Sequence, residues 1–226
     1  MVLFASRLFA SRRALLFAPA LFATHQTQSP LPATAASSGR SHPATVVYIA
    51  QSLDGYIARL DGGLDWLPQP SEDASDDFGW SEFQAGIDAI LMGRKTFETV
   101  VGLGGPWPYK DKQVTVLSST LKSVPKSIEM QPITLSCESP TEVLSSMARN
   151  GVKRVYVDGG TLINSLLRDD VVDEMIITTV PVLIGEGVRL FPAGALDADK
   201  TWIVEGDPHV YQGGLVKTRY RRVRRI

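Results

Sequence analysis

Short apolar runs alternate with amphipathic segments along the chain from residue 45 onward. The runs are rich in β-branched residues, which is typical of buried strands, and they cover 45–52, 87–93, 112–119, 131–136, 152–160 and 173–185. Between them, apolar residues recur near helical spacing in 76–86, 95–104, 139–151 and 161–170. Two further strand-like segments follow, at 200–207 and 213–223. This order predicts one α/β domain with a mainly parallel central sheet, antiparallel C-terminal edge strands and helices on both faces.

Residues 1–44 have a different composition from the rest of the chain. They are rich in Ala and Ser, carry four arginines, and precede the first acidic residue, Asp54. This composition predicts a disordered, organelle-targeting transit peptide for a plastid or mitochondrion, with residues 45–226 as the folded domain. A secretory signal is the alternative, because the apolar run 14–23 could serve as its core. That run is too short to span a bilayer.

The composition excludes several classes of function. The net charge of −1 gives no basic field for nucleic acid, and one cysteine with three histidines cannot build a disulfide or a histidine-rich metal site. We therefore expect a small-molecule substrate, no metal, and no nucleic-acid or membrane partner. The arginine-rich segment 219–225 is expected to continue a last strand, with its arginines in solvent or paired with acids.

Three of the predicted strands end in groups that can bind phosphate. Gly93 is followed by Arg94, Lys95 and Thr96 at a helix start, Ser118 and Ser119 end the next strand, and Gly159 and Gly160 follow a third. The carboxyl ends of parallel strands share one sheet edge, and helix N-termini attract anions. Each motif alone could be an ordinary turn, but together they predict a dinucleotide site. Neither a G-x-G-x-x-G nor a P-loop pattern is present, which argues against an ordinary Rossmann domain and an ATPase.

In this order, the motifs MGRKTFE, VLSS, GG before a helix, and DEMIITTVPVLIGEGVRLFP resemble the dihydrofolate reductase superfamily. Together with SLDGYIA, they are most similar to the reductase domain of the bifunctional deaminase-reductase of riboflavin biosynthesis, over roughly residues 45–223. The resemblance implies a dihydrofolate reductase-like fold, the cofactor NADPH and a small heterocyclic substrate. The preferred reaction is reduction of a 5-amino-6-(5-phosphoribosylamino)uracil-type pyrimidine. Relatives of this type pair through their sheets, so a homodimer is expected.

The resemblance also implies positions for the cofactor. Lys95 or Arg94 would bind the 2′-phosphate, the paired serines would lie near the adenosine ribose, and the paired glycines would seat the pyrophosphate. Two residues around the SLDG loop would flank the nicotinamide through their backbone. The full expected set is Ala50, Ile57, Gly93, Arg94, Lys95, Thr96, Leu117, Ser118, Ser119, Val157, Gly159, Gly160, Thr161 and Leu162.

The substrate side leaves alternatives open. Asp54, at the rim of the nicotinamide site, is one catalytic candidate and could equally be a turn aspartate. A second carboxylate is expected at Asp77 when counted back from Arg94, or at Glu72 or Asp73 when counted from Trp66-Leu67-Pro68; Asp77 could also cap a helix. Thr178 matches a threonine that supports the substrate pocket, and it could be an ordinary strand residue.

Two other functions compete with the riboflavin-type reaction. Dihydrofolate reduction is one, although Lys112 stands where folate-binding members carry an arginine, and lysine lacks the bidentate fork. The other is an NADPH-binding protein without catalysis, which stays open because the sequence does not identify a single catalytic carboxylate.

Overall fold

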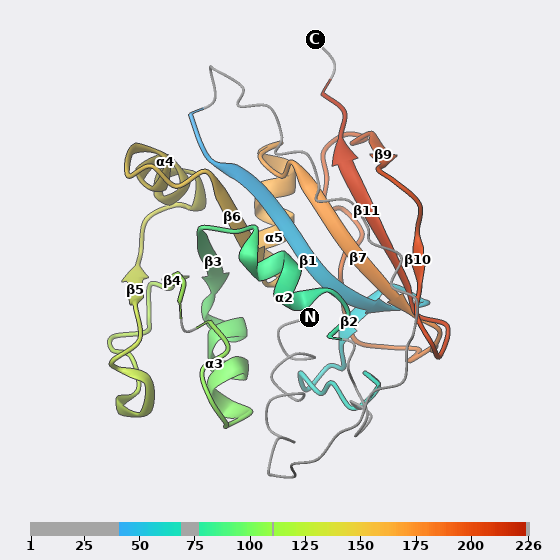
Figure 1. Ribbon diagram of the computed structural model, residues 1–226, viewed down its shortest axis with the longest axis horizontal. Coiled ribbons are helices and arrows are strands. Elements are labelled where there is room, and N and C mark those ends of the chain that lie inside the picture. The colour runs from blue at the N-terminus through green and yellow to red at the C-terminus, as the bar shows by residue number, and fades with distance from the viewer. Residues whose placement is uncertain (1–40, 69–76, 110, 225–226) are drawn as a thin grey trace, which may run out of the picture.

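The computed structural model describes residues 41–68, 77–109 and 111–224, which form a nine-stranded sheet with helices on both faces (Figure 1). The strands are β1 (Ala44–Ser52), β3 (Ala89–Gly93), β4 (Gln113–Leu117), β5 (Ile133–Ser136), β6 (Arg154–Asp158), β7 (Glu174–Val180), β9 (Trp202–Val204), β10 (His209–Val210) and β11 (Val216–Arg222). Their order is β10-β11-β7-β1-β6-β3-β4-β5, and β9 pairs with β11. The five pairings from β7 to β5 are parallel, whereas β11 runs antiparallel to β7, β9 and β10. The predicted fold class is confirmed.

Four α-helices cover the two faces of the sheet: α2 (Trp80–Ala85), α3 (Arg94–Gly102), α4 (Pro140–Arg149) and α5 (Gly160–Arg168). Helices α2 and α3 bury Trp80, Phe83 and Phe97 against a cluster that includes Tyr48 and Tyr156 of the sheet. Helices α4 and α5 pack into a second cluster, on residues that alternate along the same strands with those of the first. Because strand side chains alternate between faces, the sheet has an α2–α3 face and an α4–α5 face.

The sheet order places the predicted binding motifs side by side. Strands β6, β3 and β4 are parallel neighbours, with Asp158 opposite Met92 and Gly93 opposite Leu117. The segments that follow their carboxyl ends are therefore adjacent at one edge. This arrangement is the one on which the prediction of a dinucleotide site depended.

A small antiparallel ribbon adds two short strands to the predicted elements. The segment 52–67, which has Asp-Gly pairs at 54–55 and 61–62, contains β2 (Tyr56–Ala58), which pairs with β8 (Val188–Arg189). The strand predicted over 173–185 ends at Val180, because Pro181 has no N–H to continue the ladder. The chain beyond Pro181 then turns back toward the loop after β1.

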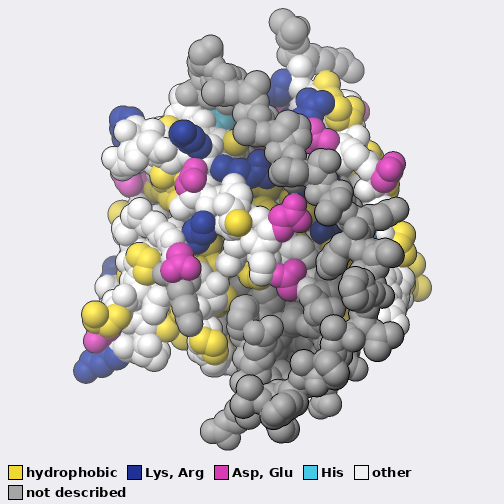
Figure 2. Space-filling model, viewed as in Figure 1, with side chains coloured by type: hydrophobic (Ala, Val, Ile, Leu, Met, Phe, Trp, Pro, Cys, Tyr) yellow, Lys and Arg dark blue, Asp and Glu magenta, His cyan; other side chains and the backbone are white. Residues whose placement is uncertain are grey.

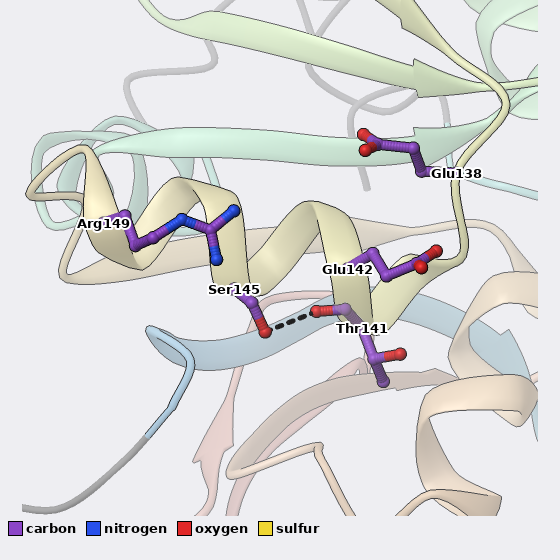
Figure 3. A pocket seen from close by; sticks show the side chains of 5 residues that line it. All are labelled: Glu138, Thr141, Glu142, Ser145 and Arg149. Atoms are coloured by element: carbon purple, nitrogen blue, oxygen red, sulfur yellow. Dashed lines mark hydrogen bonds between the residues drawn. The ribbon is translucent and has the colours of Figure 1, made fainter.

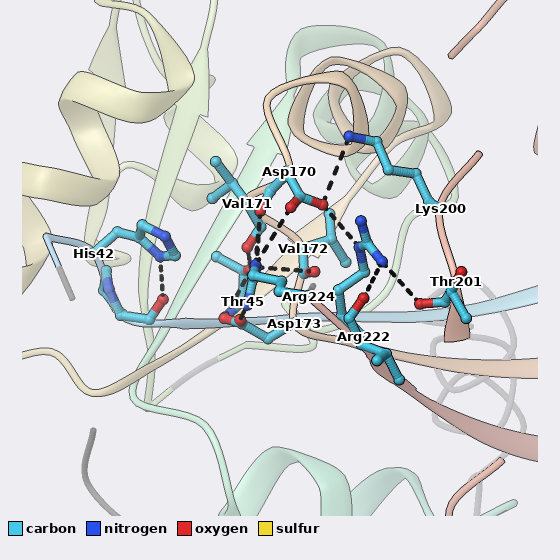
Figure 4. A network of polar contacts seen from close by, with 12 residues as sticks. His42, Thr45, Asp170, Val171, Val172, Asp173, Lys200, Thr201, Arg222 and Arg224 are labelled. Carbon is cyan, nitrogen blue, oxygen red and sulfur yellow. Dashed lines mark hydrogen bonds and ion pairs between the residues drawn. The ribbon is translucent and has the colours of Figure 1, made fainter. Parts of the chain in front are cut away.

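A polar network lies at the amino ends of β1 and β7 (Figure 4). Arg222 and Lys200 contact Asp170, and Arg224 pairs with Asp173, whose carboxylate also accepts from the backbone N–H of Thr45. Burial would raise the pKa of Asp170, but the hydrogen bond from Arg222 and the neighbouring cations lower it. The arginines of this last strand are therefore held by acids, as expected from the sequence.

Residues 1–40 of the predicted transit peptide lie outside the described residues, and Ala44 already belongs to β1. The leader therefore stays a prediction. Across the described ranges, every helix is too short or too polar to cross a membrane.

Candidate cofactor and substrate site

Helices α3 and α5 begin directly at the shared strand edge, and neither start is capped by a side chain. Their N-cap residues are Gly93 and Gly159, which offer no side-chain oxygen to the first-turn N–H groups. The first N–H groups of a helix have no partner within it, and they carry the positive end of the helix dipole. Two such ends on adjacent strands form a site suited to an anion with more than one phosphate.

The paired glycines bring three predicted motifs into contact. A Cβ on Gly159, whose φ is +112°, would lie 2.6 Å from Oγ1 of Thr96 in α3. A Cβ on Gly160 would lie 2.9 Å from Cδ1 of Ile57. Glycine is therefore favoured at 159 by both its φ and its close neighbour, whereas at 160 the Ile57 side chain could move aside; this packing was not visible in the sequence. Thr96, Ile57 and the two glycines form one contiguous surface.

The remaining cofactor candidates differ in how freely they could reach a ligand. Arg94 donates to both carboxylate oxygens of Glu98, at 2.8 and 3.1 Å, whereas Lys95 is exposed. Oγ of Ser118 accepts from the backbone N–H groups of Thr120 and Leu121 and so closes a turn.

The other cofactor candidates differ in exposure, which decides whether their side chains or only their backbone could contact a ligand. Ser119 and Thr161 are exposed at the edge, and Gly93 pairs with Leu117 beside them. Val157 and Leu162 are buried in the cluster of the α4–α5 face, so only their backbone could contact a cofactor there.

Asp54 joins two loops rather than standing free. Its carboxylate accepts from Oγ of Ser52 at 2.6 Å and from the backbone N–H groups of Ile184 and Gly185. The Ser52 hydroxyl, followed by these N–H groups, lowers the pKa of Asp54 despite some desolvation. An ionised carboxylate in this role fastens the loop between Ala50 and Ile57 to the segment after β7, and it is poorly suited to donating a proton.

Asp77 and Lys112 also have structural partners. The two oxygens of Asp77 accept from the backbone N–H groups of Gly79 and Ser81 at the start of α2, at 2.9 and 2.7 Å. Nζ of Lys112 donates to the carbonyl of Ile87 at 2.7 Å, at the amino ends of β3 and β4. The alternative acids Glu72 and Asp73 lie outside the described residues.

The α2–α3 face carries several buried polar atoms with no hydrogen-bond partner among the described residues. One is Oγ1 of Thr178, which is 1% exposed and stands opposite Ala50 in the sheet. The others on this face are Trp66 Nε1, Trp80 Nε1, Trp107 Nε1 and Tyr109 OH. Burying such groups unpaired is costly, so partners beyond the described residues would stabilise them.

Asp158 is a candidate that the sequence reading missed. It ends β6 next to Gly159, is 8% exposed, and shares the α2–α3 face with Tyr156. Burial raises its pKa, and hydrogen bonds with Tyr156 and the Gly159 N–H only partly oppose this. The sequence feature that could have pointed to it is an acidic residue directly after the apolar run Val155-Tyr156-Val157. A carboxyl that retains its proton to higher pH can act as an acid.

Similarity to known proteins agrees with this geometry. Residues 43–210 match the model of the RibD C-terminal domain. The chain belongs to the RibD C-terminal domain family. Bacillus subtilis YwjB is 35% identical over 148 residues, which cover 65% of this chain and 82% of YwjB.

Solved structures place this RibD-type domain among dihydrofolate reductase-like folds. A candidate riboflavin biosynthesis protein from Shewanella sp. PV-4 is 36% identical, with a TM-score of 0.73 over 80% of this chain and 99% of that one. Enterococcus faecalis dihydrofolate reductase, solved with NADP(H), is 16% identical and shares the fold, with a TM-score of 0.56 over 79% of this chain and 96% of its own.

A groove of about 360 Å³ lies elsewhere on this RibD-type domain, along α4 (Figure 3). Glu138 and Glu142 line it together with Thr141, Ser145 and Arg149. Its two acids make it unsuitable for a phosphate-rich cofactor. On the face shown in Figure 2, basic and acidic side chains are interspersed among the coloured residues.

Proposed function

We propose that this protein is an NADPH-dependent reductase of a small heterocyclic substrate, and that the substrate is a pyrimidine carrying a phosphoribosylamino group. The observation that carries the proposal is the pair of uncapped starts of α3 and α5, with the buried Asp158 next to the N-cap of α5 and on the α2–α3 face. Membership of the RibD C-terminal domain family supports the same reaction class.

The donor set fits a phosphorylated dinucleotide. The first-turn N–H groups of α5 would hold the pyrophosphate, and those of α3 would contact a second phosphate. Lys95 would bind the 2′-phosphate, because Arg94 is already paired with Glu98. When bound, NADPH would supply the hydride that reduces C1 of the sugar, the carbon attached to the bridging amino nitrogen.

The chain's own residues then handle the proton. Reduction of the open-chain imine of a ribosylamine adds a hydride to C1 of the sugar and a proton to the imine nitrogen. Asp158 keeps its proton to higher pH than an exposed aspartate, so it is the proposed donor. Asp54 holds the loop around Ala50 and Ile57 in place. Thr178 and the unpaired donors of the α2–α3 face would bind the ring of the substrate.

Two contacts favour the pyrimidine over dihydrofolate. The Lys112 ammonium is bonded to the carbonyl of Ile87, so binding a glutamate tail would require breaking that bond. Asp77 is the candidate for a carboxylate that binds the pteridine ring of a folate. Both of its carboxylate oxygens accept hydrogen bonds from backbone N–H groups at the start of α2. A dihydrofolate reductase would need such a carboxylate to face its substrate.

Turnover by the purified full-length chain tests the proposal. NADPH oxidation is followed with the phosphoribosylamino-pyrimidine and, in parallel, with dihydrofolate. We expect oxidation with the pyrimidine, loss of it in Asp158→Asn, and retention in Asp88→Asn, whose carboxylate lies at the amino end of β3 and binds the N–H groups of Lys153 and Arg154. Tight NADPH binding without turnover of either compound would instead support a non-catalytic nucleotide-binding protein.

We further propose that two copies pair through the edge formed by β9 and β10. Ile203, Val204 and Val210 are exposed there, and exposed apolar strands are prone to pairing. Sedimentation should give a dimer that Val210→Lys weakens, and a monomer in the unaltered protein would contradict this.

A further inference from the structure

Three donors converge on a single backbone carbonyl at the entry to α2. The carbonyl oxygen of Phe78 accepts from the hydroxyl of Tyr48 at 2.7 Å, from the hydroxyl of Tyr211 at 3.0 Å and from Nζ of Lys217 at 3.3 Å. The donors come from β1, from the loop after β10 and from β11. We refer to Phe78 and these three donors as the carbonyl clasp.

The clasp holds a backbone that is not intrinsically favoured. Phe78 has φ of +57° and Gly79 has φ of +77°, so two consecutive residues adopt the left-handed conformation. A bulky residue such as Phe rarely occupies this region, and such strain persists only where the surroundings enforce it. A Cβ on Gly79 would lie 2.7 Å from Nζ of Lys217, so glycine is required for the ammonium to reach the carbonyl.

The helix that this turn positions packs on the same face of the sheet as the proposed substrate site. Trp80 and Phe83 of α2 pack on Tyr48 and Tyr156, and the buried Trp80 Nε1 has no hydrogen-bond partner among the described residues. Lys217 stands opposite Thr178 in the sheet, and Thr178 stands opposite Ala50. Lys217 therefore lies beside Thr178, which is proposed to bind the substrate ring, and also bonds to the backbone at the start of α2.

We propose that Lys217 is a positioning residue for the proposed reaction, acting through the Phe78 carbonyl to fix α2 over the substrate. The inference rests on the proposed function for its catalytic consequence. A six-residue helix is too short to be stable alone, so its place depends on such anchors. The ammonium also lies 5.3 Å from the centre of the Tyr211 ring, which keeps the two donors together.

Hydrogen exchange of the full-length protein tests the clasp without any substrate. In Lys217→Met, the amides of α2 should exchange roughly tenfold faster, while those of α4 stay as in the unaltered protein. Tyr211→Phe removes one donor and should give a smaller increase in the same amides. The matched control is Arg221→Met, which removes a cation from the same strand that pairs with Glu205 instead.

Kinetics separate positioning from simple stabilisation. We expect Lys217→Met to raise the KM for the pyrimidine about tenfold and to change the KM for NADPH less than about twofold. The reason is that the variant loosens α2, on the face proposed to bind the substrate, and leaves the starts of α3 and α5 in place. Unchanged exchange in α2 would overturn the clasp, and an equal rise in both KM values would overturn the positioning role. If Lys217→Met does not fold, Tyr211→Phe and Tyr48→Phe are judged by the same criteria. Absence of turnover by the unaltered chain would overturn the proposed function and with it the positioning role, while exchange would still decide the clasp.

Discussion

Three helices begin at the carboxyl edge of the sheet, and their starts are built in two different ways. Helix α4 has a complete capping box, in which Oγ of Ser139 accepts from the N–H of Glu142 while the Glu142 carboxylate accepts from the N–H of Ser139. Helices α3 and α5 start at glycines with no side-chain cap. Capping stabilises a helix, so its absence at adjacent strand ends leaves N–H groups for a ligand. The difference separates a helix start that is closed by its own side chains from two that stay open, as the proposed cofactor site requires.

The largest effect is expected from removing the carboxyl group of Asp158, beside the uncapped start of α5. Asp158→Asn should lower kcat by about 10²- to 10⁴-fold, the usual contribution of a general acid. Steady-state kinetics beside Asp88→Asn would measure the loss. In the unaltered protein, kcat should fall as pH rises through the raised pKa of Asp158, because the protonated form is required.

The same variant makes a prediction about stability. Because the pKa of Asp158 is higher in the folded than in the unfolded state, folded-state stability should fall as pH rises from the unfolded pKa to the folded one. Asp158→Asn cannot titrate, so its stability should not fall in this way. The difference in melting temperature, variant minus unaltered protein, should therefore rise as pH increases between the two pKa values. An unaltered pH dependence in the variant would show that folding does not raise the pKa of Asp158.

The next largest effect is expected from Gly159→Ala. Its Cβ would push Thr96 and α3 away from α5, so NADPH affinity should fall more than about tenfold, with roughly 1–3 kcal/mol of destabilisation from the positive φ. Gly151→Ala is the control, because Gly151 also has a positive φ, of +83°, but no atom near the added Cβ. NADPH titration should separate the two, and equal affinity loss in both would contradict the proposed cradle.

A smaller effect should distinguish the two cations at the start of α3. Lys95→Met is expected to weaken NADPH binding about five- to tenfold, more at low salt, and to weaken NADH binding little. Arg94→Met should have less effect, because Glu98 already neutralises that guanidinium. Binding titrations of both nucleotides check this, and the reverse order would assign the 2′-phosphate to Arg94.

The smallest effect is predicted for the closed helix start. Ser139→Ala should cost about 1 kcal/mol of folding free energy through the lost cap and should leave NADPH affinity unchanged. Denaturant unfolding and nucleotide titration of the same preparation measure both. A loss of affinity would mean that α4 also belongs to the binding edge.

Local patterns predicted most of the fold. The apolar runs predicted β1, β3, β4 and β6 to within two residues at each end, since a buried parallel strand is marked by its own composition. They also predicted the start of β7, but not its end at Val180 before Pro181. Strands β2 and β8, of three and two residues, are too short to show a period.

The site was harder to predict, because its contacts join distant segments. Asp54 binds N–H groups 130 and 131 residues away, so no local motif could show that it fastens a loop. The proposed role of Asp158 depends on its burial on the α2–α3 face, which only the assembled sheet reveals. The proposed phosphate-binding motifs could be predicted because strand ends and glycines stand together in sequence.

The central place of β1 has a consequence for how the protein folds. Both of its neighbours come late: Thr45 bonds to Asp173, 128 residues away, and Tyr156 bonds to Tyr48 across 108 residues. Closing such long loops costs chain entropy before any pairing stabilises them. Until β6 and β7 are available, β1 has two unpaired, apolar edges, which invite pairing with other chains. We therefore expect slow refolding, and exposed strand edges in the nascent chain, from the same strand order that brings the proposed binding motifs together.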